Sequence, residues 1–242
     1  MSPELLSQLE RLVTPRRLAA LERALDERTR HVTVVLEDLH SPHNAGACLR
    51  TCEAFGVQDV HIVENANGFQ ESDVACGAAR WLTVHRYGDG EDNTAACLSA
   101  LKERGHRLIA AVPPPGRRQR TAVDQEKQSA APRAAAVVTL KDLDITARTA
   151  LLFGSERDGL SPTALGLAEG FVAVPTVGLT ESLNLSVAVA LCVHHLTGKL
   201  RASGVDWRLS DEERSALRTH WLRTSTRKWA GAIERRLPRR TV

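Results

Sequence analysis

The strongest constraint on the fold is an alternation of short apolar runs with helical stretches, which starts after His31 and continues to about residue 200. The apolar runs are three to five residues long: Val32 to Leu36, Val60 to Val63, Leu82 to Val84, Leu108 to Val112, Leu151 to Phe153 and Phe171 to Val174. Most are separated by amphipathic or small-residue stretches, at 43 to 55, 92 to 105, 161 to 169 and 184 to 198. Strands that alternate with helices form parallel sheets covered by helices. The sequence therefore predicts an α/β fold with a mostly parallel sheet.

The composition is that of a globular protein that can bury a core without cross-links. The chain has 242 residues, of which 43% are hydrophobic and 25% charged. No apolar run approaches the roughly 20 residues that span a bilayer, and the N-terminus lacks the basic and apolar regions of a secretory signal. We expect a cytoplasmic protein with no membrane segment.

Cysteine and histidine spacing does not favour a metal site. The five cysteines include no Cys-x-x-Cys pair, and we interpret them as small buried residues in a reducing cytosol: Cys48, Cys52, Cys76, Cys97 and Cys192. A metal-dependent hydrolase that uses His40, His43 and His61 has little support, because His-Glu-x-x-His spacing is missing. We predict that no metal is bound.

The net charge of +3 is unevenly distributed. Residues 1–31 carry +1, residues 32–198 carry −5 and residues 199–242 carry +7. A localised positive excess favours a phosphate-bearing partner, because contacts to a polyanion release counterions. A solvated helix face is an equally weighted alternative.

Both ends of the chain are predicted to be helical extensions of the central domain, which we place at residues 32–200. Residues 1–31 form an arm of two short helices that begin at Ser2-Pro3 and Thr14-Pro15. Residues 201–242 form a basic extension, with a helix that begins at a Ser210–Glu213 capping box and runs to about Arg236.

The C-terminal helix has the residue types of an RNA surface. Its cations alternate with Trp221 and Trp229: Arg214, Arg218, Arg223, Arg227, Lys228, Arg235 and Arg236. In the alternative interpretation, Leu217, Trp221 and Leu222 pack on a core and leave the charges in water. We favour a mixed role.

A proline-rich segment at 113–134 is predicted to be a long exposed loop. It opens with Pro113-Pro114-Pro115-Gly116, whose three prolines cannot lie inside a ladder, and it carries Arg117, Arg118 and Arg120. Loops of this length in compact domains are commonly functional or disordered.

Three polar, glycine-containing segments follow predicted strands, where a parallel sheet opens a crevice. In the first, the helix that starts near Asn44 places one set of residues on a single face and turns Arg50 away from it: Ala45, Cys48, Leu49, Cys52 and Phe55. Asn44 or His43 could cap this helix, whose exposed N–H groups favour an anion. Alternatively, Asn44 is only a cap and Arg50 a surface charge that pairs with Glu53.

The second and third segments could approach a ligand with their backbones. Glu156 lies in a strand-to-helix turn between Gly154 and Gly159, and glycines let a ligand come close; an ordinary turn is the alternative. The third segment places Ser182 and Asn184 at the start of a buried helix. Both are good caps, but a glycine loop there could also hold an adenosyl group.

Taken together, the three segments resemble the motifs of the SPOUT superfamily of RNA ribose methyltransferases, and within it the TrmH-type tRNA (guanosine-2′-O)-methyltransferases. The similarity covers about 1–112 and 148–200. It rests on three motifs in this order: Asn44-x-Gly46-x-x-x-Arg50, Phe153-Gly154-x-Glu156-x-x-Gly159 and Pro175-x-x-Gly178-x-x-x-Ser182-Leu183-Asn184-x-Ser186-Val187-Ala188.

The resemblance implies a SPOUT α/β knot, with a deep trefoil knot at about residues 150–198, a homodimer and S-adenosylmethionine as the cofactor, released as S-adenosylhomocysteine. The residues implied around the cofactor are Phe153, Gly154, Glu156, Val174, Pro175, Gly178, Leu179, Ser182, Leu183 and Asn184. The implied catalytic residues are Asn44, Arg50, Glu156, Ser182 and Asn184, with Asn44 supplied by the partner subunit, which thus completes the active site. The RNA-binding residues that we expect are Arg16, Arg17, His43, Arg50, Arg80, Arg227 and Lys228.

The implied reaction suits these residues. A ribose 2′-hydroxyl must lose a proton while it attacks a sulfonium methyl group, so alignment can supply much of the acceleration. A guanidinium is always protonated and has no acceptor, so we expect Arg50 to clamp a substrate phosphate and to stabilise the developing alkoxide. The identity of the base stays open. Three features depart from the usual pattern of the tRNA group: Thr176, the run Leu179-Thr180-Glu181 and the longer connection at 113–147. These departures bear on which RNA is the target more than on which reaction is catalysed.

The predicted function is 2′-O-methylation of a tRNA nucleotide, in particular the D-loop guanosine at position 18. Two alternatives stay open: an rRNA 2′-O-methyltransferase of the same superfamily, and a non-catalytic knotted RNA-binding protein. Because only about thirty residues precede the first strand, the tRNA branch is favoured over the rRNA branch, whose members frequently carry a separate RNA-binding domain there.

Overall fold

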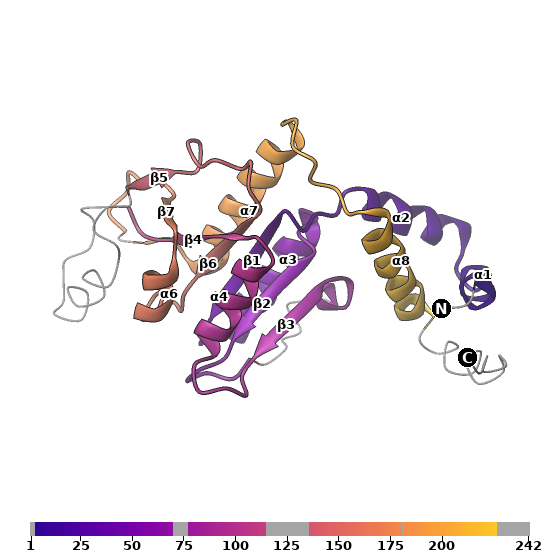
Figure 1. The fold of residues 1–242 in the computed structure, drawn as a ribbon, viewed down its shortest axis with the longest axis horizontal. Coiled ribbons are helices and arrows are strands. Elements are labelled where there is room, and N and C mark those ends of the chain that lie inside the picture. Colours follow the sequence, from indigo (N-terminus) through magenta and orange to yellow (C-terminus); the bar gives the residue numbers. More distant parts are fainter. Residues whose placement is uncertain (1–2, 70–76, 115–135, 181, 227–242) are drawn as a thin grey trace. The chain divides into compact units, whose positions relative to one another are not determined.

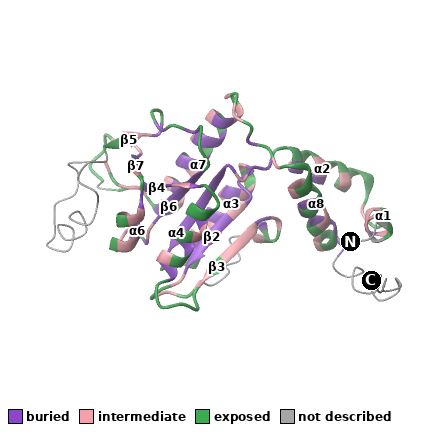
Figure 2. Cartoon of the chain, in the orientation of Figure 1, coloured by how far each residue is buried: buried purple, intermediate pink, exposed green. Residues whose placement is uncertain are grey.

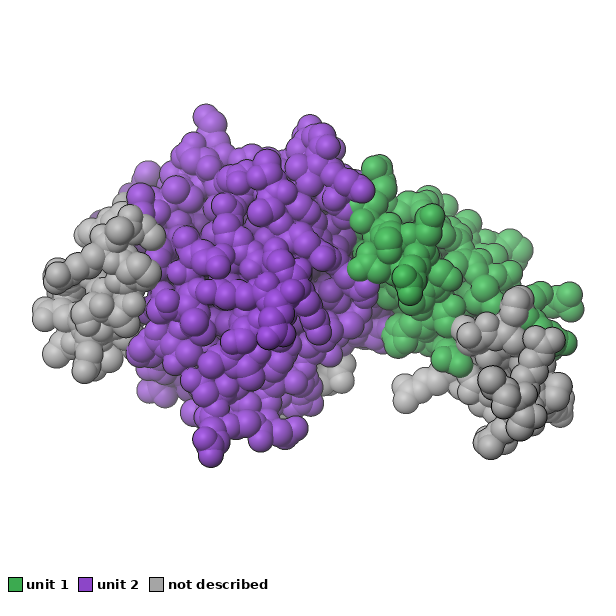
Figure 3. Space-filling view, viewed as in Figure 1, with its two compact units in different colours: residues 1–28, 208–242 green, residues 29–207 purple. Residues whose placement is uncertain are grey.

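The structure is a computed structural model and describes four ranges of the chain: 3–69, 77–114, 136–180 and 182–226. The chain divides into two compact units (Figure 3). The larger unit spans residues 29–207, and the smaller unit combines residues 1–28 with 208–242. The segments at the two ends of the chain therefore belong to the same unit.

The larger unit contains a parallel sheet, which confirms the predicted fold class (Figure 1). The described residues supply seven strands in the order β3-β2-β1-β6-β4-β7-β5, and every neighbouring pair is parallel. The strands are β1 (Val32–Glu37), β2 (Asp59–Val63), β3 (Thr83–Tyr87), β4 (Arg107–Ala111), β5 (Val137–Thr139), β6 (Thr149–Phe153) and β7 (Gly170–Ala173). All but β5 coincide with a predicted apolar run.

The two central strands explain why those runs are almost continuously apolar. Every residue of β1 and of β6 is buried, and the two strands pair in register from Val32 and Thr149 to Leu36 and Phe153. A parallel strand that is covered on both faces needs apolar side chains on both sides of its pleat. Figure 2 shows the buried residues concentrated in this part of the sheet.

Helices cover both faces of the sheet. On one face, α3 (Pro42–Ala54) and α7 (Leu185–Arg201) pack over side chains such as Val34 and Leu36. On the other, α4 (Asn93–Glu103) and α6 (Pro162–Leu167) pack over Val35 and its neighbours. A short 3₁₀ helix, η2 (Ala78–Trp81), precedes β3. No helix in the described part of the chain is long and apolar enough to cross a membrane.

The start of α3 differs from the sequence prediction, which gave the cap to Asn44 or His43. Ser41 is the N-cap, and its hydroxyl accepts a hydrogen bond from the Asn44 backbone N–H at 3.3 Å. Pro42 follows at the first helical position, where its fixed φ and missing N–H are harmless. The Asn44 side chain is therefore not needed as a cap. The predicted buried face is confirmed: Ala45, Cys48, Leu49 and Cys52 are each at most 1% exposed.

The smaller unit consists of three helices: α1 (Pro3–Arg11), α2 (Pro15–Asp26) and α8 (Asp211–Ser225). Helix α8 begins at the predicted Ser210–Glu213 capping box. Its described part runs to Ser225, and the Thr226 hydroxyl donates to the Leu222 carbonyl at 2.7 Å. The rest of the predicted helix lies outside the described residues.

Contacts inside the smaller unit show which side chains of α8 pack on its core and which form ion pairs. Leu217, Trp221 and Leu222 are buried, and the Arg28 guanidinium lies 4.9 Å from the Trp221 ring centroid. Arg214 donates to Glu22 at 2.8 Å and to Asp26 at 2.9 Å. Arg218 donates to Glu10 at 2.6 Å and also to Glu22. The packing alternative therefore holds for Leu217, Trp221 and Leu222, which are core residues, and both arginines pair with carboxylates of α1 and α2.

The buried cysteines agree with the sequence interpretation. Cys48, Cys52, Cys97 and Cys192 are free and buried, whereas Cys76 lies outside the described residues. Burial raises the pKa of the Cys97 and Cys192 thiols to about 12 and that of Cys48 further still. These thiols are therefore protonated at neutral pH and are poor nucleophiles.

Candidate active site

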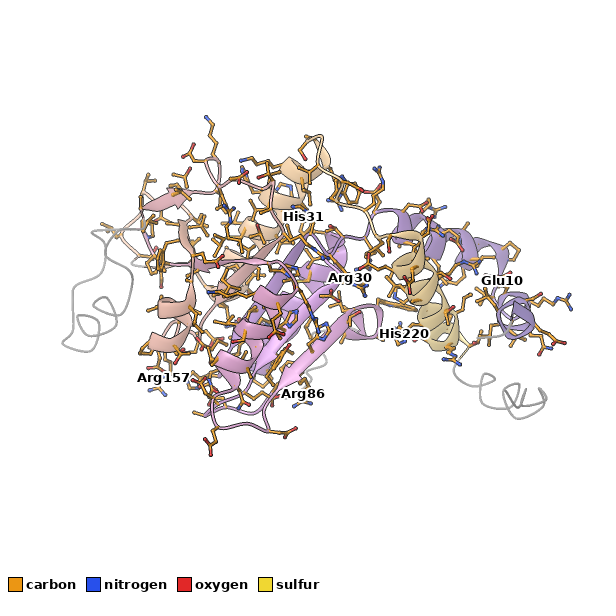
Figure 4. All side chains as sticks on the ribbon, viewed as in Figure 1. Glu10, Arg30, His31, Arg86, Arg157 and His220 are labelled. Atoms are coloured by element: carbon orange, nitrogen blue, oxygen red, sulfur yellow. The ribbon has the colours of Figure 1, made fainter. Side chains whose placement is uncertain are left out.

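Three loops meet at the carboxyl edge of the sheet. The first connects β1 to α3, the second connects β6 to α6, and the third connects β7 to α7. Strands β1 and β6 are neighbours in the sheet, while β4 lies between β6 and β7. The chain reverses its direction of progress across the sheet here, because β2 and β3 lie on one side of β1 whereas β6, β4 and β7 lie on the other. Arg157 marks this edge and Arg30 and His31 mark the opposite one (Figure 4).

A hydrogen-bonded network joins one side chain from each motif. The Asn44 side-chain amide donates to Glu156 Oε1 at 2.6 Å, and its oxygen accepts from Asn184 Nδ2 at 3.4 Å. The His40 backbone N–H also donates to Glu156 Oε2, at 3.4 Å. All of these residues belong to one chain, so the network forms without the second subunit that was expected to supply Asn44.

The loop that carries Glu156 is held closed by its own backbone. Ser155 and Gly159 exchange two backbone hydrogen bonds, of 3.1 and 3.0 Å, and the Asp158 N–H donates to Ser155 Oγ at 3.0 Å. A Cβ atom on Gly154 would lie 2.0 Å from the carbonyl carbon of Gly159, and Gly159 itself has φ +67°. Gly154 is thus required because the backbone of Gly159 approaches it closely. We had expected a ligand to make this close approach.

The far end of this loop is fixed by a buried carboxylate. Glu37, the last residue of β1, is 3% exposed. Its Oε2 accepts from the Ser161 backbone N–H at 2.8 Å, and its Oε1 accepts from the hydroxyls of Ser161 and Thr94 at 2.6 Å each. Ser161 is also the N-cap of α6. The end of β1 is therefore tied directly to the residue where the second loop ends.

The third loop presents apolar side chains to solvent. The side chains of Val177 and Leu179 are 99% and 104% exposed, and a Cβ atom on Gly178 would meet nothing within 4 Å. The Thr176 hydroxyl, in contrast, is buried and has no hydrogen-bond partner among the described residues. Asn184 ends the loop as the N-cap of α7, where its side-chain oxygen accepts from the Ser186 N–H at 2.9 Å.

The other predicted cofactor and catalytic residues lie around this network at different depths. Arg50 is exposed on α3, and Ser182 is exposed two residues before Asn184. Pro175 is exposed, whereas Val174 and Leu183 are half-buried. Phe153 is 2% exposed and belongs to the core under α3 and α7.

The predicted RNA-binding residues do not form one cluster. His43 is exposed next to Asn44, and Arg16 and Arg17 are exposed on α2 in the smaller unit. Arg80 is exposed on η2, and its guanidinium lies 4.9 Å from the Trp81 ring centroid. Arg227 and Lys228 lie outside the described residues, as do Arg117, Arg118 and Arg120.

Sequence reasoning overlooked several side chains that hold the site together. Glu37 was not singled out, although an acid at the end of a mostly apolar strand is a signal of a buried, paired charge. The second is Asp158, whose Oδ2 lies 3.4 Å from His40 Nε2. No sequence signal connects His40 with Asp158, because the two residues are brought together only when β1 pairs with β6.

An apolar groove runs between α3 and α7 beside the network. Its volume is about 460 Å³, and its lining includes the exposed side chains of Val187 and Leu191. The rings of Phe55 and His194 meet edge to face at its border, with centroids 5.2 Å apart. The full lining is Ala47, Thr51, Phe55, Ser186, Val187, Ala190, Leu191 and His194.

Two histidines outside the site, His61 on β2 and His85 on β3, stack on each other. The rings of His61 and His85 stack with centroids 4.4 Å apart, and His61 Nδ1 lies 3.4 Å from the Tyr87 hydroxyl. Burial, followed by repulsion from His85, lowers the pKa of His61 to about 3. Within the described residues no three His, Cys, Asp or Glu side chains are placed to hold a metal ion.

The chain matches a family of RNA methylases. Residues 31–194 match the model of the SpoU rRNA Methylase family, which is more than half of the chain. The chain therefore belongs to this family. The matched range includes all three loops and the network that joins them.

Relatives extend the similarity beyond that range. The chain is 32% identical over 216 residues to the tRNA (guanosine(18)-2′-O)-methyltransferase of Borreliella burgdorferi, covering 89% of this chain and 88% of that protein. It is 32% identical over 213 residues to the protein of the same name from Thermus thermophilus, covering 87% and 97%. The crystal structure of the A. aeolicus TrmH/SpoU tRNA modifying enzyme has the same fold, with a TM-score of 0.68 at 22% identity, covering 87% of this chain and 97% of that one.

Proposed function

We propose that the protein transfers a methyl group from S-adenosylmethionine to the ribose 2′-hydroxyl of guanosine 18 in tRNA. The observation that carries the proposal is the network in which Asn44, Glu156 and Asn184, one from each motif, meet within hydrogen-bond distance. Guanosine 18 is supported by two relatives that carry this nucleotide in their names. Their alignments cover 89% and 87% of this chain and so extend beyond residues 31–194, which the family model matches. A tRNA substrate also supports a cytoplasmic location.

The second and third loops fit the methyl donor. The exposed Val177 and Leu179 would be covered by the faces of the adenine ring, and the open space at Gly178 leaves room for the nucleoside. When bound, S-adenosylmethionine supplies an electrophilic methyl group on a sulfonium sulfur. We place it against Phe153, Gly154, Glu156, Val174, Pro175, Gly178, Leu179, Ser182, Leu183 and Asn184, inside the trefoil knot that we infer at about residues 150–198.

The network fixes the polar groups that would meet the reacting hydroxyl. Asn44 bonds both Glu156 and Asn184, so the two loops are held in one arrangement before any substrate arrives. Such preorganisation supplies the alignment on which methyl transfer depends. Arg50 and His43, both exposed on α3, are the candidates for binding the RNA phosphate. Ser182 and Asn184 would hold the hydroxyl, and the proton acceptor is left open.

We infer that a second copy of the chain fills the groove between α3 and α7. Val187 and Leu191 are exposed apolar side chains, and they lie beside Ser186, which bonds the network residue Asn184. A two-fold interface at this groove would place the same helices of both copies against each other. Arg50 lies between the groove residues Ala47 and Thr51 along α3. A second Arg50 would therefore approach each site and complete it.

The test is a methylation assay with labelled S-adenosylmethionine and two tRNA transcripts, one of which carries 2′-deoxyguanosine at position 18. The unmodified transcript should accept one methyl group and the deoxy transcript none. Arg50→Ala should abolish turnover while far-UV and near-UV circular dichroism stay unchanged. Equal labelling of the two transcripts would refute guanosine 18 as the target, and labelling of ribosomal RNA alone would favour the rRNA alternative.

Without turnover on any RNA, calorimetry with S-adenosylhomocysteine separates the remaining possibilities. A specific site with no turnover would indicate the wrong RNA. The absence of any binding would favour a non-catalytic RNA-binding protein and would contradict the proposed methyl transfer.

A further inference from the structure

We propose that Glu37 is a positioning residue for the second loop: its buried carboxylate fixes Ser161 and thereby sets where Glu156 meets Asn44 and Asn184. Glu37 lies one residue beyond the last register pair of β1 with β6, Leu36 and Phe153. It therefore stands beside the point where the chain leaves β6 to form the loop. This inference rests on the proposed function, since it concerns the same methyl-donor site.

Both oxygens of the Glu37 carboxylate accept hydrogen bonds from neighbouring residues. Its two oxygens accept three hydrogen bonds of 2.6 to 2.8 Å, two from Ser161 and one from Thr94. A carboxylate that is 3% exposed is costly to bury unless such donors replace water. The two short bonds from Ser161 to this buried carboxylate leave Ser161 little freedom.

The loop is held at its start, its middle and its end. Its start is locked to the sheet by β6 and by the close contact of Gly154 with Gly159. Its end is Ser161, which also accepts from the Ala164 N–H at 3.1 Å as the cap of α6. Glu37 is thus the link through which β1 holds the end of the loop, while Asn44 holds its middle at Glu156. Both contacts come from the segment that runs from β1 into α3, so that segment aligns the second motif with the first.

Thr94 offers a control that separates positioning from stability. It bonds the same carboxylate, but it lies on α4, and its hydroxyl otherwise accepts from Asn65 Nδ2 at 3.0 Å. Thr94→Val removes a bond to Glu37 without touching the loop. Glu37→Gln puts a donating amide NH2 group in place of one carboxylate oxygen, so the donors on that side lose their charged acceptor.

The experiment compares full-length wild type, Glu37→Gln and Thr94→Val by hydrogen–deuterium exchange over 154–163 and by calorimetry with S-adenosylhomocysteine. Glu37→Gln should speed exchange in this peptide at least about fivefold and weaken S-adenosylhomocysteine binding about fivefold to tenfold. Its affinity for tRNA should stay within about twofold. Thr94→Val should change neither the exchange of this peptide nor S-adenosylhomocysteine binding. Equal effects of the two variants on exchange and on affinity would overturn the positioning role.

A second variant covers the case in which Glu37→Gln does not fold. Ser161→Ala removes the hydroxyl from the other side of the link and should give the same local increase in exchange and the same loss of affinity. Unchanged exchange and affinity in Ser161→Ala would contradict the proposal. Failure of the wild type to bind S-adenosylhomocysteine would instead contradict the proposed function, whereas the exchange comparison would still report on Glu37.

Discussion

At the scale of single residues, position 154 must be glycine because the backbone of Gly159 occupies the space of a side chain. Conformational freedom is not the reason, since Gly154, unlike Gly159, is not among the glycines with positive φ. The nearest atoms to a Cβ there would be Gly159 C, Gly159 O and Leu160 N, all within 2.2 Å. These are backbone atoms of a closed loop and cannot move aside cheaply.

We predict that Gly154→Ala lowers the free energy of unfolding by roughly 3 kcal/mol or opens the Ser155–Gly159 turn. The control is Gly198→Ala on α7, where a Cβ atom would meet nothing within 4 Å. That substitution should stabilise the helix by up to about 1 kcal/mol. Chemical denaturation of both variants measures the difference, and a Gly154→Ala protein as stable as wild type would show that the loop is not closed in solution.

His61 gives the protein a pH-dependent stability. Its pKa is about 3 in the folded protein and 6.5 in an exposed chain, so between these values the unfolded chain binds a proton that the folded chain does not. Stability should therefore fall as the pH falls through this range, by about 1.4 kcal/mol per pH unit from this residue. Above pH 6.5 the His61 contribution should be constant.

The measurement is urea denaturation of wild type and His61→Gln at several values between pH 7 and pH 4. Since carboxylates also titrate there, the difference between the two proteins isolates His61. The variant should show the flatter profile. Parallel profiles would mean that His61 is not buried in its neutral form.

At the scale of helices, α8 is tied to α1 and α2 by ion pairs that cross between the two ends of the chain. Arg218 is 20% exposed and bonds Glu10 and Glu22, which are 208 and 196 residues away in sequence. We predict that Arg218→Ala lowers stability by about 1 kcal/mol, more at low salt than at high salt, and leaves tRNA affinity nearly unchanged.

The matched comparison is Arg16→Ala, because Arg16 is exposed on α2. If Arg16 contacts a phosphate, its loss should reduce the slope of log affinity against log salt by about 1 without changing stability. Filter binding at several salt concentrations and thermal unfolding distinguish the two roles. The reverse pattern would show that α8, and not α2, contributes the charge that binds tRNA.

The elements that were predictable from sequence are those with a dominant local signal. The apolar runs of β1, β2, β4, β6 and β7 and the Ser-Pro and capping-box helix starts needed no tertiary information. Strand β5 was missed because Val137 is exposed, the other two residues are only half-buried, and the strand pairs with one neighbour at the edge of the sheet. The α3 cap was assigned to Asn44 or His43, although Ser41 carries the same local signal as the other Ser-Pro starts because it stands directly before Pro42.

The site was less predictable than the elements that carry it. The motif residues Asn44, Glu156 and Asn184 could be singled out, but their hydrogen bonds depend on β1 lying next to β6, which is a property of strand order. Glu37 illustrates the same limit. Its partners Thr94 and Ser161 are 57 and 124 residues away in sequence, so no local pattern identifies them.

At the scale of the whole molecule, the groove between α3 and α7 is the surface that we expect a second copy to cover. We predict that Leu191→Asp, which places a charge on a side chain that is 42% exposed in the groove, converts a dimer into monomers. Leu12→Asp is the control, because Leu12 is similarly exposed, at 47%, but lies in the smaller unit. Sedimentation velocity would distinguish the species, and identical masses for both variants and wild type would place the interface elsewhere.

The course of the chain around β7 has a practical consequence. The chain leaves the sheet at the end of β4 and rejoins it at β5, and these two strands flank β7 on either side. Because closing a longer connection costs only logarithmically more entropy, the length between them is almost independent of the rest of the fold. This connection leaves β4 between β6 and β7, at the same edge of the sheet as the second and third loops, so a reporter peptide spliced in there would start beside the proposed methyl-donor site.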